Sequence, residues 1–431
     1  MYTFTRNPRP APTYAAVGMA NLVSWSKQPV VALVIVAFIR LSLPLLVPSH
    51  FLHLLSSRRE LNPPPRHPPS LLEQSLSIAL HESPEHASLS PASPLLLSLF
   101  HVTNLRSQLA LAFCSTSIDI ISSTIILSFD TSSYTPSLAF LVNPPAVLAS
   151  LGGSPAPAEA LAALFAILSA FHGHSFFAGS ALALAASLSP HLIALAPALA
   201  LLSAQHRTHS APKIMKSSLL LIFALALSLI GILALCTLSL RSLGCTLRLT
   251  SAFAHEVFSV NDHSPDLGLH WYLSAQTLSR FRSVLHAAVH YVSIALIPSF
   301  IARTRAHEPF SLVVFSFGCA VLGRSHPSAA DVGPWLSLHT LAPHITSRMR
   351  TPFVECTLYL FSLSFAFGAW EMWVENKTGN ANHFFGASLV YCAFQVLVLC
   401  DFLNATLRYV DEHKKRLSTY SSSNQEKFHD E

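Results

Sequence analysis

Long apolar segments separated by short polar loops recur along this chain of 431 residues. An α-helix needs about 20 mostly apolar residues to cross a hydrocarbon core of ~30 Å. The clearest candidate runs from Ser217 to Leu240 and carries no charged residue. Further spans are predicted at residues 28–48, 283–301, 309–322, 329–345, 352–374 and 384–406. The pattern therefore predicts an all-α, polytopic membrane protein built as a multi-helix bundle.

The N-terminal half differs, because several of its apolar segments are too short to cross a bilayer alone. The apolar segments of this half lie at residues 93–105, 107–129, 137–151, 159–171, 175–188 and 191–204. Prolines such as Pro144, Pro190 and Pro197 interrupt them, and a proline inside a helix removes a hydrogen bond and breaks the helix. Irregular backbone is tolerated at membrane depth where protein buries it. We therefore expect short re-entrant or broken helices that pack against their neighbours.

Composition excludes a soluble globule. Charged residues make up 11% of the chain, against roughly 25% in soluble domains, and the mean hydropathy is +0.47. The formal net charge of +5 lies in short runs between apolar segments. No basic patch is interleaved with aromatic residues, so we expect no nucleic-acid partner. The seven cysteines lie mostly in apolar segments and form no CxxC pair, which predicts neither a zinc site nor a disulfide framework.

The distribution of lysine and arginine predicts the orientation of the C-terminal half. The loops rich in basic residues are predicted to be cytosolic, together with the tail: residues 205–216, 302–308 and 346–351. The loops between them are then predicted to face the lumen: residues 241–282, 323–328 and 375–383. The predicted domains are a cytosolic segment 1–27, a membrane domain 28–406 with lumenal loops 49–91 and 241–282, and a disordered cytosolic tail 407–431.

The segment from Phe258 to Tyr272 joins two predicted spans and is the most informative polar stretch. Its sequence is FSVNDHSPDLGLHWY. Pro265 and Gly268 predict a turn. Trp271 and Tyr272 suit the membrane interface, where a ring lies partly in lipid while its N–H or O–H reaches water. From residue types alone, the segment is an interfacial loop with an aromatic anchor.

This segment resembles a signature of the PIG-U family, the U subunit of the GPI transamidase complex, whose loop is close to SVxDLTPNIGLFWYFF. The shared residues are Ser259, Val260, Asp262, Pro265, Gly268, Leu269, Trp271 and Tyr272. The chain departs from the family pattern at Asp266, where the family usually has Asn, and at His270, where it usually has Phe.

A second stretch, WVENKTGNANHFF from Trp373 to Phe385, resembles the family's WIYAGSANSNFF. Asn380 and Asn382 correspond to its Asn-x-Asn, and the pair of phenylalanines ending at Phe385 corresponds to its paired Phe. One residue, assigned to His383, is inserted here. Weaker echoes follow the family order from about residue 28 to 409, so the resemblance covers most of the chain.

The resemblance implies a non-catalytic subunit of the GPI transamidase complex in the endoplasmic reticulum membrane. That complex removes a C-terminal signal from a protein and joins the new carboxyl end to the ethanolamine phosphate of a GPI lipid. The reacting cysteine and histidine lie on a different, cysteine-protease-like subunit. The implied partners are therefore the other subunits, the GPI lipid and the membrane, with no cofactor. The implied fold is like that of the lipid-linked glycosyltransferases of superfamily C.

Asn380 and Asn382 are the residues we expect to contact the GPI headgroup, because amides donate and accept hydrogen bonds without net charge. The residues expected to line or support the same site are Asp262, Trp271, Tyr272, Phe384 and Phe385. This hypothesis requires residues 262–272 and 380–385 to meet on one side of the bilayer. The alternative is that Asn380 and Asn382 form only an Asn-rich turn.

Two other functions stay open from the sequence. A dolichol-phosphate-mannose-dependent mannosyltransferase of GPI biosynthesis shares the superfamily, but such enzymes generally need an acidic base in the first lumenal loop. That loop has no aspartate and no adjacent acid pair, and its glutamates are Glu60, Glu73, Glu82 and Glu85. A secondary transporter would fit the broken helices, although no internal repeat is evident.

Ionisable residues at membrane depth are costly and often functional, and Arg40, Asp119 and Asp401 lie in or beside predicted spans. Asp119 is expected to pair with a neighbouring helix or with the backbone. The stretch from His81 to His86 combines His and Glu but is not HExxH. We therefore predict no metal site and treat the other histidines as composition.

Overall fold

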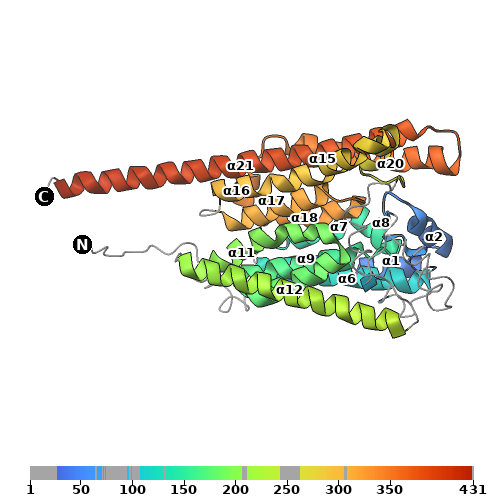
Figure 1. The fold of residues 1–431 in the computed structure, drawn as a ribbon, viewed down its shortest axis with the longest axis horizontal. Helices are drawn as coiled ribbons and strands as arrows, with labels where there is room; N and C mark the ends of the chain where they lie inside the picture. Colours follow the sequence, from blue (N-terminus) through green and yellow to red (C-terminus); the bar gives the residue numbers. More distant parts are fainter. Residues whose placement is uncertain are drawn as a thin grey trace.

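The helices of this protein lie roughly parallel to one long axis and form a bundle (Figure 1). The structure, a computed structural model, describes residues 27–63, 66–69, 71, 73, 95, 96, 99, 107–130, 133–205, 211–242, 263–304 and 308–429. Within these ranges every regular element is a helix. The predicted all-α class is confirmed.

Among the described residues, five helical stretches are long and apolar enough to cross a membrane. They are Gln108–Phe129, Met215–Cys236, Ser279–Thr304, Pro352–Glu375 and Ala381–Lys415. A sixth span is possible if α1 (Lys27–Leu46) and α2 (Ser49–Ser57) count as one helix bent by 100°. Pro48 lies at the bend, and a proline restricts the residue before it to extended backbone. The predicted polytopic architecture is confirmed.

Short helices fill the N-terminal half between α6 (Gln108–Phe129) and the long α12 (Ala211–Ser242). They are α7 (Thr135–Val142), α8 (Pro144–Leu151), α9 (Ala156–Phe171), α10 (Ser175–Leu188), η2 (Pro190–Leu195) and α11 (Ala196–Gln205). Asn143 ends α7, and its side chain accepts a hydrogen bond from the Ala146 amide of α8 at 3.4 Å. The prediction of broken helices in this half is confirmed.

The short helices pack so closely that small residues are needed between them. Helix α12 runs along one edge of the bundle (Figure 1) and packs against α10. At Gly179 of α10, an added Cβ would lie 2.4 Å from the main-chain oxygen of Leu221. Glycine is therefore required at this crossing.

Residues 309–345 differ from the sequence prediction of two spans. Helix α17 (Pro309–Leu322) has 14 residues, and nearly all of its side chains are buried. The predicted span 329–345 is wrong as a single helix, because it is divided into η4 (Ala329–Asp331), α18 (Val332–His339) and α19 (Pro343–Thr346). Both regions belong to the protein interior, where neighbouring helices rather than lipid surround them.

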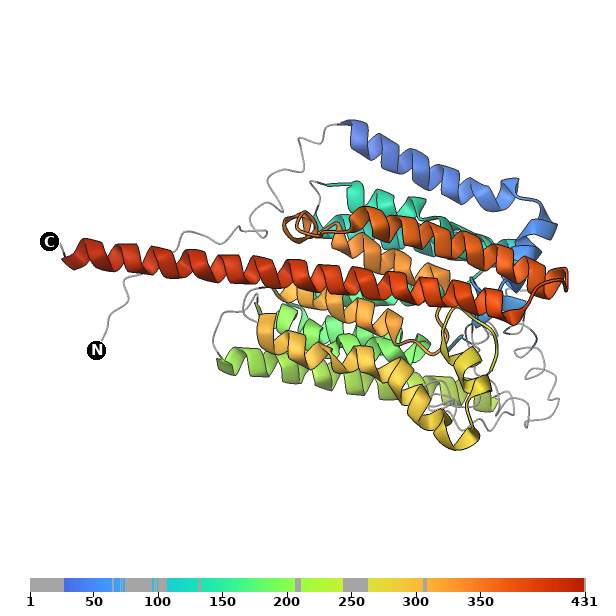
Figure 2. The same cartoon turned by 90° about the horizontal axis from the view of Figure 1, so that it is seen from above.

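The remaining helices lie in residues 263–429, and several of them meet at one end of the bundle. They are α14 (His270–Gln276), η3 (Ser279–Phe281), α15 (Arg282–Ala295), α16 (Ile297–Thr304), α20 (Pro352–Trp370), the π-helical turn η5 (Glu371–Glu375) and α21 (Ala381–His429). In both views α21 extends well past the other helices (Figures 1 and 2). The predicted disordered tail thus differs from the structure, which is helical to His429. The Glu, Lys and Arg residues of this tail are good helix formers, so its polarity is compatible with a helix.

Two ionisable residues at membrane depth pair with each other. The Arg40 guanidinium of α1 donates to the Asp119 carboxylate of α6, and the same nitrogen donates to Ser150 Oγ at 2.7 Å. Asp119 therefore pairs with a neighbouring helix, one of the two predicted outcomes. Asp401 instead accepts the amide hydrogens of Arg350 and Thr351, at 2.6 and 2.9 Å.

Candidate functional site

Two segments that are distant in sequence meet at the end of the bundle where α21 begins. The Tyr272 hydroxyl donates a hydrogen bond to Asn382 Oδ1 at 2.5 Å. The Tyr272 ring stacks on Phe385, with centroids 4.1 Å apart and planes 16° apart. The convergence required by the sequence hypothesis is therefore present for the described residues of both segments. Asp262 lies outside those residues.

Buried aromatic rings support this contact from beneath. Trp271 is 6% exposed and stacks on Trp373, with centroids 5.9 Å apart. Phe384 is fully buried and lies 6.0 Å from both indoles. Because these rings are enclosed, Trp271 and Phe384 are supports, whereas the half-buried Tyr272 and Phe385 form the accessible part. We call the set Trp271, Tyr272, Trp373, Asn380, Asn382, Phe384 and Phe385 the aromatic–amide cluster.

The two amide side chains of the cluster are exposed. Asn380 Oδ1 accepts a hydrogen bond from the Asn382 amide at 3.0 Å, which starts α21. Asn380 therefore forms the asparagine turn that the sequence analysis gave as the alternative to a headgroup contact. Asn382 does more, because its side-chain carbonyl oxygen joins α21 to Tyr272 of α14. Both side chains remain accessible to a ligand from the surface.

Asp266 holds the loop that precedes α14. Its Oδ1 accepts the Gly268 amide hydrogen at 2.7 Å, and its Oδ2 lies 2.8 Å from Nδ1 of His326. The Ser388 hydroxyl of α21 donates to the Asp266 main-chain oxygen at 3.2 Å. Asp266 therefore fixes the loop to two other segments, through its carboxylate to His326 and through its main-chain oxygen to Ser388. This role requires a polar side chain that can accept a hydrogen bond from a main-chain amide, as Asn also can.

A buried charge cluster lies behind the same end of the bundle. Asp331 receives both terminal nitrogens of Arg66, at 2.8 and 2.9 Å, and one of Arg324 at 3.2 Å. Arg324 also pairs with Glu159 at 2.8 Å. Burial acts to raise the pKa of Asp331, but the charges of Arg324 and Arg66 outweigh it, so the pKa lies well below its usual range. The cluster joins α9, the segment after α2 and the loop before α18.

The adjoining cavity has a volume of about 30 Å³ and is lined by Glu159, Asp331 and mostly apolar side chains. This space can hold roughly two or three water molecules. The charged residues here act as connections within the fold.

Residues after α2 hold the turn between α20 and α21. Arg58 donates to the Glu371 carboxylate at the start of η5 and lies 3.5 Å from Glu60. The Glu60 main-chain oxygen accepts the amide hydrogen of Ala329 at 2.9 Å. Burial raises the pKa of the fully enclosed Glu60 carboxyl to about 7, and nearby Arg58 only partly offsets this. Glu60 is therefore closed off from solvent; Glu82 and Glu85 lie outside the described residues.

Several residues that contribute to this end of the bundle were not predicted from the sequence. Trp373 belonged to the matched motif, and its position beside a turn between spans could have marked it as an interfacial aromatic residue. The Arg58–Glu371 pair joins residues 313 positions apart and left no local signal. A buried group of three histidines at the base of α14 was also missed, although two of them are four residues apart in α15.

The fold and the site together define a polytopic α-helical membrane protein with an aromatic and amide surface at one end of its bundle. The family model of the GPI transamidase subunit PIG-U matches residues 34–391. Because this match covers most of the chain, the chain belongs to the PIG-U family.

Two curated relatives illustrate the similarity. The human GPI-anchor transamidase component PIGU is 26% identical over 276 residues, which are 63% of this chain and 62% of the human protein. The GPI transamidase component GAB1 of Saccharomyces cerevisiae is 28% identical over 144 residues, which are 33% of this chain and 36% of the yeast protein. The aligned region thus spans about three fifths of the human relative's length.

Proposed function

We propose that this chain is a non-catalytic subunit of a GPI transamidase complex in the endoplasmic reticulum membrane, where it helps to bind and position the GPI lipid. Family membership and the names of the human and yeast relatives, both GPI transamidase components, support the assignment to that complex. Its partners are then the other subunits, among them the cysteine-protease-like catalytic subunit. The observation that carries the binding role is the contact between Tyr272 and the Asn382–Phe385 stretch.

The chemistry of a GPI lipid matches the surroundings of the aromatic–amide cluster. The exposed amides of Asn380 and Asn382 can donate to and accept from sugar hydroxyls and phosphates. The main-chain N–H groups at the start of α21 favour an anion such as a phosphate. Exposed apolar side chains on η3 and η5, such as Phe281 at 50% and Met372 at 48%, suit acyl chains. This end of the bundle then faces the lumen, where the headgroup lies.

A mannosyltransferase of GPI biosynthesis is the rival function, and two observations favour the transamidase subunit over it. The curated relatives are named as transamidase components. Of the two described glutamates in the first predicted lumenal loop, Glu60 is enclosed and next to Arg58 rather than open to a substrate, whereas Glu73 is exposed.

Depletion of the protein followed by lipid and protein analysis tests the function. We expect complete GPI lipid to accumulate, with precursor proteins that retain their C-terminal signals. Accumulation of a truncated, under-mannosylated GPI would instead indicate the mannosyltransferase.

The double substitution Asn380→Ala with Asn382→Ala tests the binding site. We expect assembled complex with reduced GPI attachment, because the headgroup loses its amide contacts. The matched control is Asn404→Ala, an exposed asparagine on α21 that lies 22 positions further along the helix. Normal attachment in the double variant would show that these amides do not contact the headgroup.

A further inference from the structure

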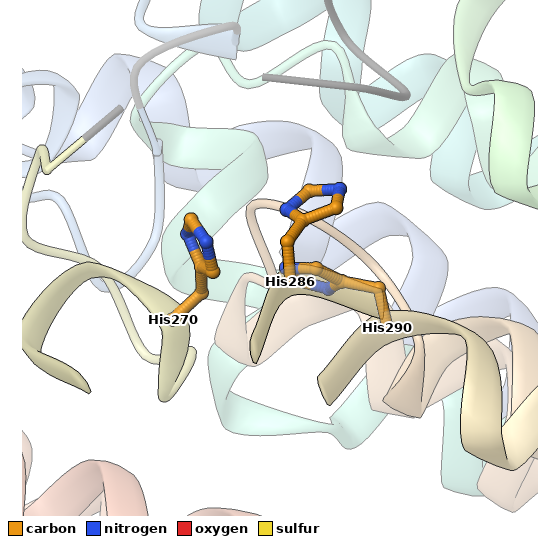
Figure 3. Close-up of side chains that lie close together, drawn as sticks. All are labelled: His270, His286 and His290. Carbon is orange, nitrogen blue, oxygen red and sulfur yellow. The ribbon is translucent and has the colours of Figure 1, made fainter. Parts of the chain in front are cut away.

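Three buried histidines meet where α14 packs on α15. His270, His286 and His290 are 5%, 3% and 3% exposed, and Figure 3 shows their rings turned toward one another. One ring nitrogen of each lies within 4.8 Å of a ring nitrogen of both others. This gathering shares no residue with the aromatic–amide cluster, although His270 directly precedes Trp271 in α14.

The local structure explains how the three rings come together. His286 and His290 are four residues apart in α15 and therefore share one face of that helix, with ring centroids 4.4 Å apart. His270 is the first residue of α14, and its ring lies 4.9 Å from that of His286 and 5.1 Å from that of His290. Two rigid helices thus supply all three side chains.

A buried polar group that lacks a hydrogen bond is costly. Among the described residues, neither ring nitrogen of His290 makes a hydrogen bond of ordinary geometry. Three adjacent imidazoles cannot all be protonated without mutual repulsion. A bound cation shared by neutral rings would remove both penalties, because it accepts the nitrogen lone pairs.

We propose that His270, His286 and His290 bind one zinc ion. Neutral imidazole nitrogens are good ligands for zinc, and three histidines with a fourth position left for water form a known tetrahedral arrangement. Zinc–nitrogen bonds of about 2.0–2.1 Å place ligand nitrogens about 3.4 Å apart. The rings must therefore close from separations of up to 4.8 Å, a movement that small side-chain rotations supply.

The ion would join α14 to α15 and so hold the aromatic pair that follows His270. Trp271 and Tyr272 are the next two residues of α14. The contact between Asp266 and His326 fixes the preceding loop. By tying α14 to α15, the ion would keep these two helices at a fixed orientation to each other.

Metal analysis of the purified complex tests the proposal directly. Full-length chain with its co-purifying partners is freed of loose metal by brief chelation, and zinc per chain is measured by mass spectrometry. The wild type is compared with His286→Gln, His290→Gln and His270→Phe, the last of which keeps an aromatic ring. We expect each variant to contain one zinc atom per chain fewer than the wild type.

His263→Gln is the matched control, because His263 lies in the same segment but bonds to Ser274 Oγ at 2.8 Å. We expect it to keep the wild-type zinc content. Equal zinc in the wild type and in the three variants would overturn the proposal. If the variants do not yield folded complex, cobalt exchanged into the wild type gives a second test. A visible spectrum typical of tetrahedral nitrogen ligation supports the site, and its absence refutes it.

Discussion

The Tyr272 hydroxyl and Asn382 Oδ1 share a 2.5 Å hydrogen bond although 110 residues separate them. Tyr272 belongs to α14, and Asn382 lies in the first turn of α21. The bond, together with the ring stack on Phe385, sets the position of α14 against α21.

Two substitutions of Tyr272 distinguish the contribution of its hydrogen bond from that of its ring stack. Tyr272→Phe removes only the bond, worth about 0.5–1.5 kcal/mol, so we expect GPI attachment to fall by about 2- to 10-fold. Tyr272→Ala also removes the contact with Phe385, and attachment should fall further. The rate of surface display of a GPI-anchored reporter measures both. Wild-type rates in the two variants would show that this contact has no part in the function.

The buried charge cluster is expected to be necessary for stability. Asp331→Asn leaves Arg66 and Arg324 with one fewer buried partner, and removal of one member of a buried pair costs about 3–5 kcal/mol. Thermal unfolding of the purified complex should show a clear loss. The control Asp411→Asn breaks an exposed 3.7 Å pair with Arg303, which contributes at most about 1 kcal/mol. Equal losses in the two variants would contradict the account.

Glu60 should make stability depend on pH. The folded state raises its pKa from 4.5 to about 7, so the folded protein binds the proton more tightly than the unfolded chain does. This contribution is complete below pH 4.5 and is lost as the pH rises toward 7. Glu60→Gln resembles the protonated form. The free energy of unfolding of this variant, relative to that of the wild type, should therefore increase by up to ~3 kcal/mol between pH 5 and pH 8. Thermal unfolding of both proteins at the two pH values measures this difference. A difference that does not change with pH would refute the prediction.

Close packing of α17 should tolerate no side chain at Gly318. An added Cβ there would lie 2.5 Å from the Trp335 ring and 2.6 Å from Leu399. Gly318→Val overpacks this contact, and we expect a loss of about 1–3 kcal/mol, measured by thermal unfolding. Gly368→Val serves as control, because its added Cβ meets nothing within 4 Å. A similar effect at both glycines would argue against the packing explanation.

The sequence predicted the long helices well because apolar length alone decides whether a segment can cross a bilayer. The predicted span 217–240 lies within α12, and 352–374 corresponds to α20 with η5. The prediction of a single span at residues 329–345 was wrong, because the apolar residues there face protein rather than lipid and the helix is broken. Hydropathy does not distinguish these two environments.

Contacts between distant residues were predictable only where a motif marked them. The resemblance marked Trp271, Tyr272 and Asn382, and topology placed them on one side, so their convergence could be expected. Arg40 and Asp119 were recognised as costly residues, but their mutual pairing depends on how α1 packs against α6. The histidine group needed His270 from another helix, and no local spacing predicts that meeting.

Photocrosslinking tests the central claim, that the aromatic–amide cluster contacts the GPI lipid. A photoreactive amino acid is placed at Asn380, at Phe385 or, as control, at Glu412, which lies about 45 Å along α21 from the cluster by helix rise. Cells labelled with a radioactive GPI precursor are irradiated, and lipid attached to this chain is measured. The account predicts labelled lipid at positions 380 and 385 but not at 412. Equal labelling at all three positions, or labelling at 412 alone, would contradict it.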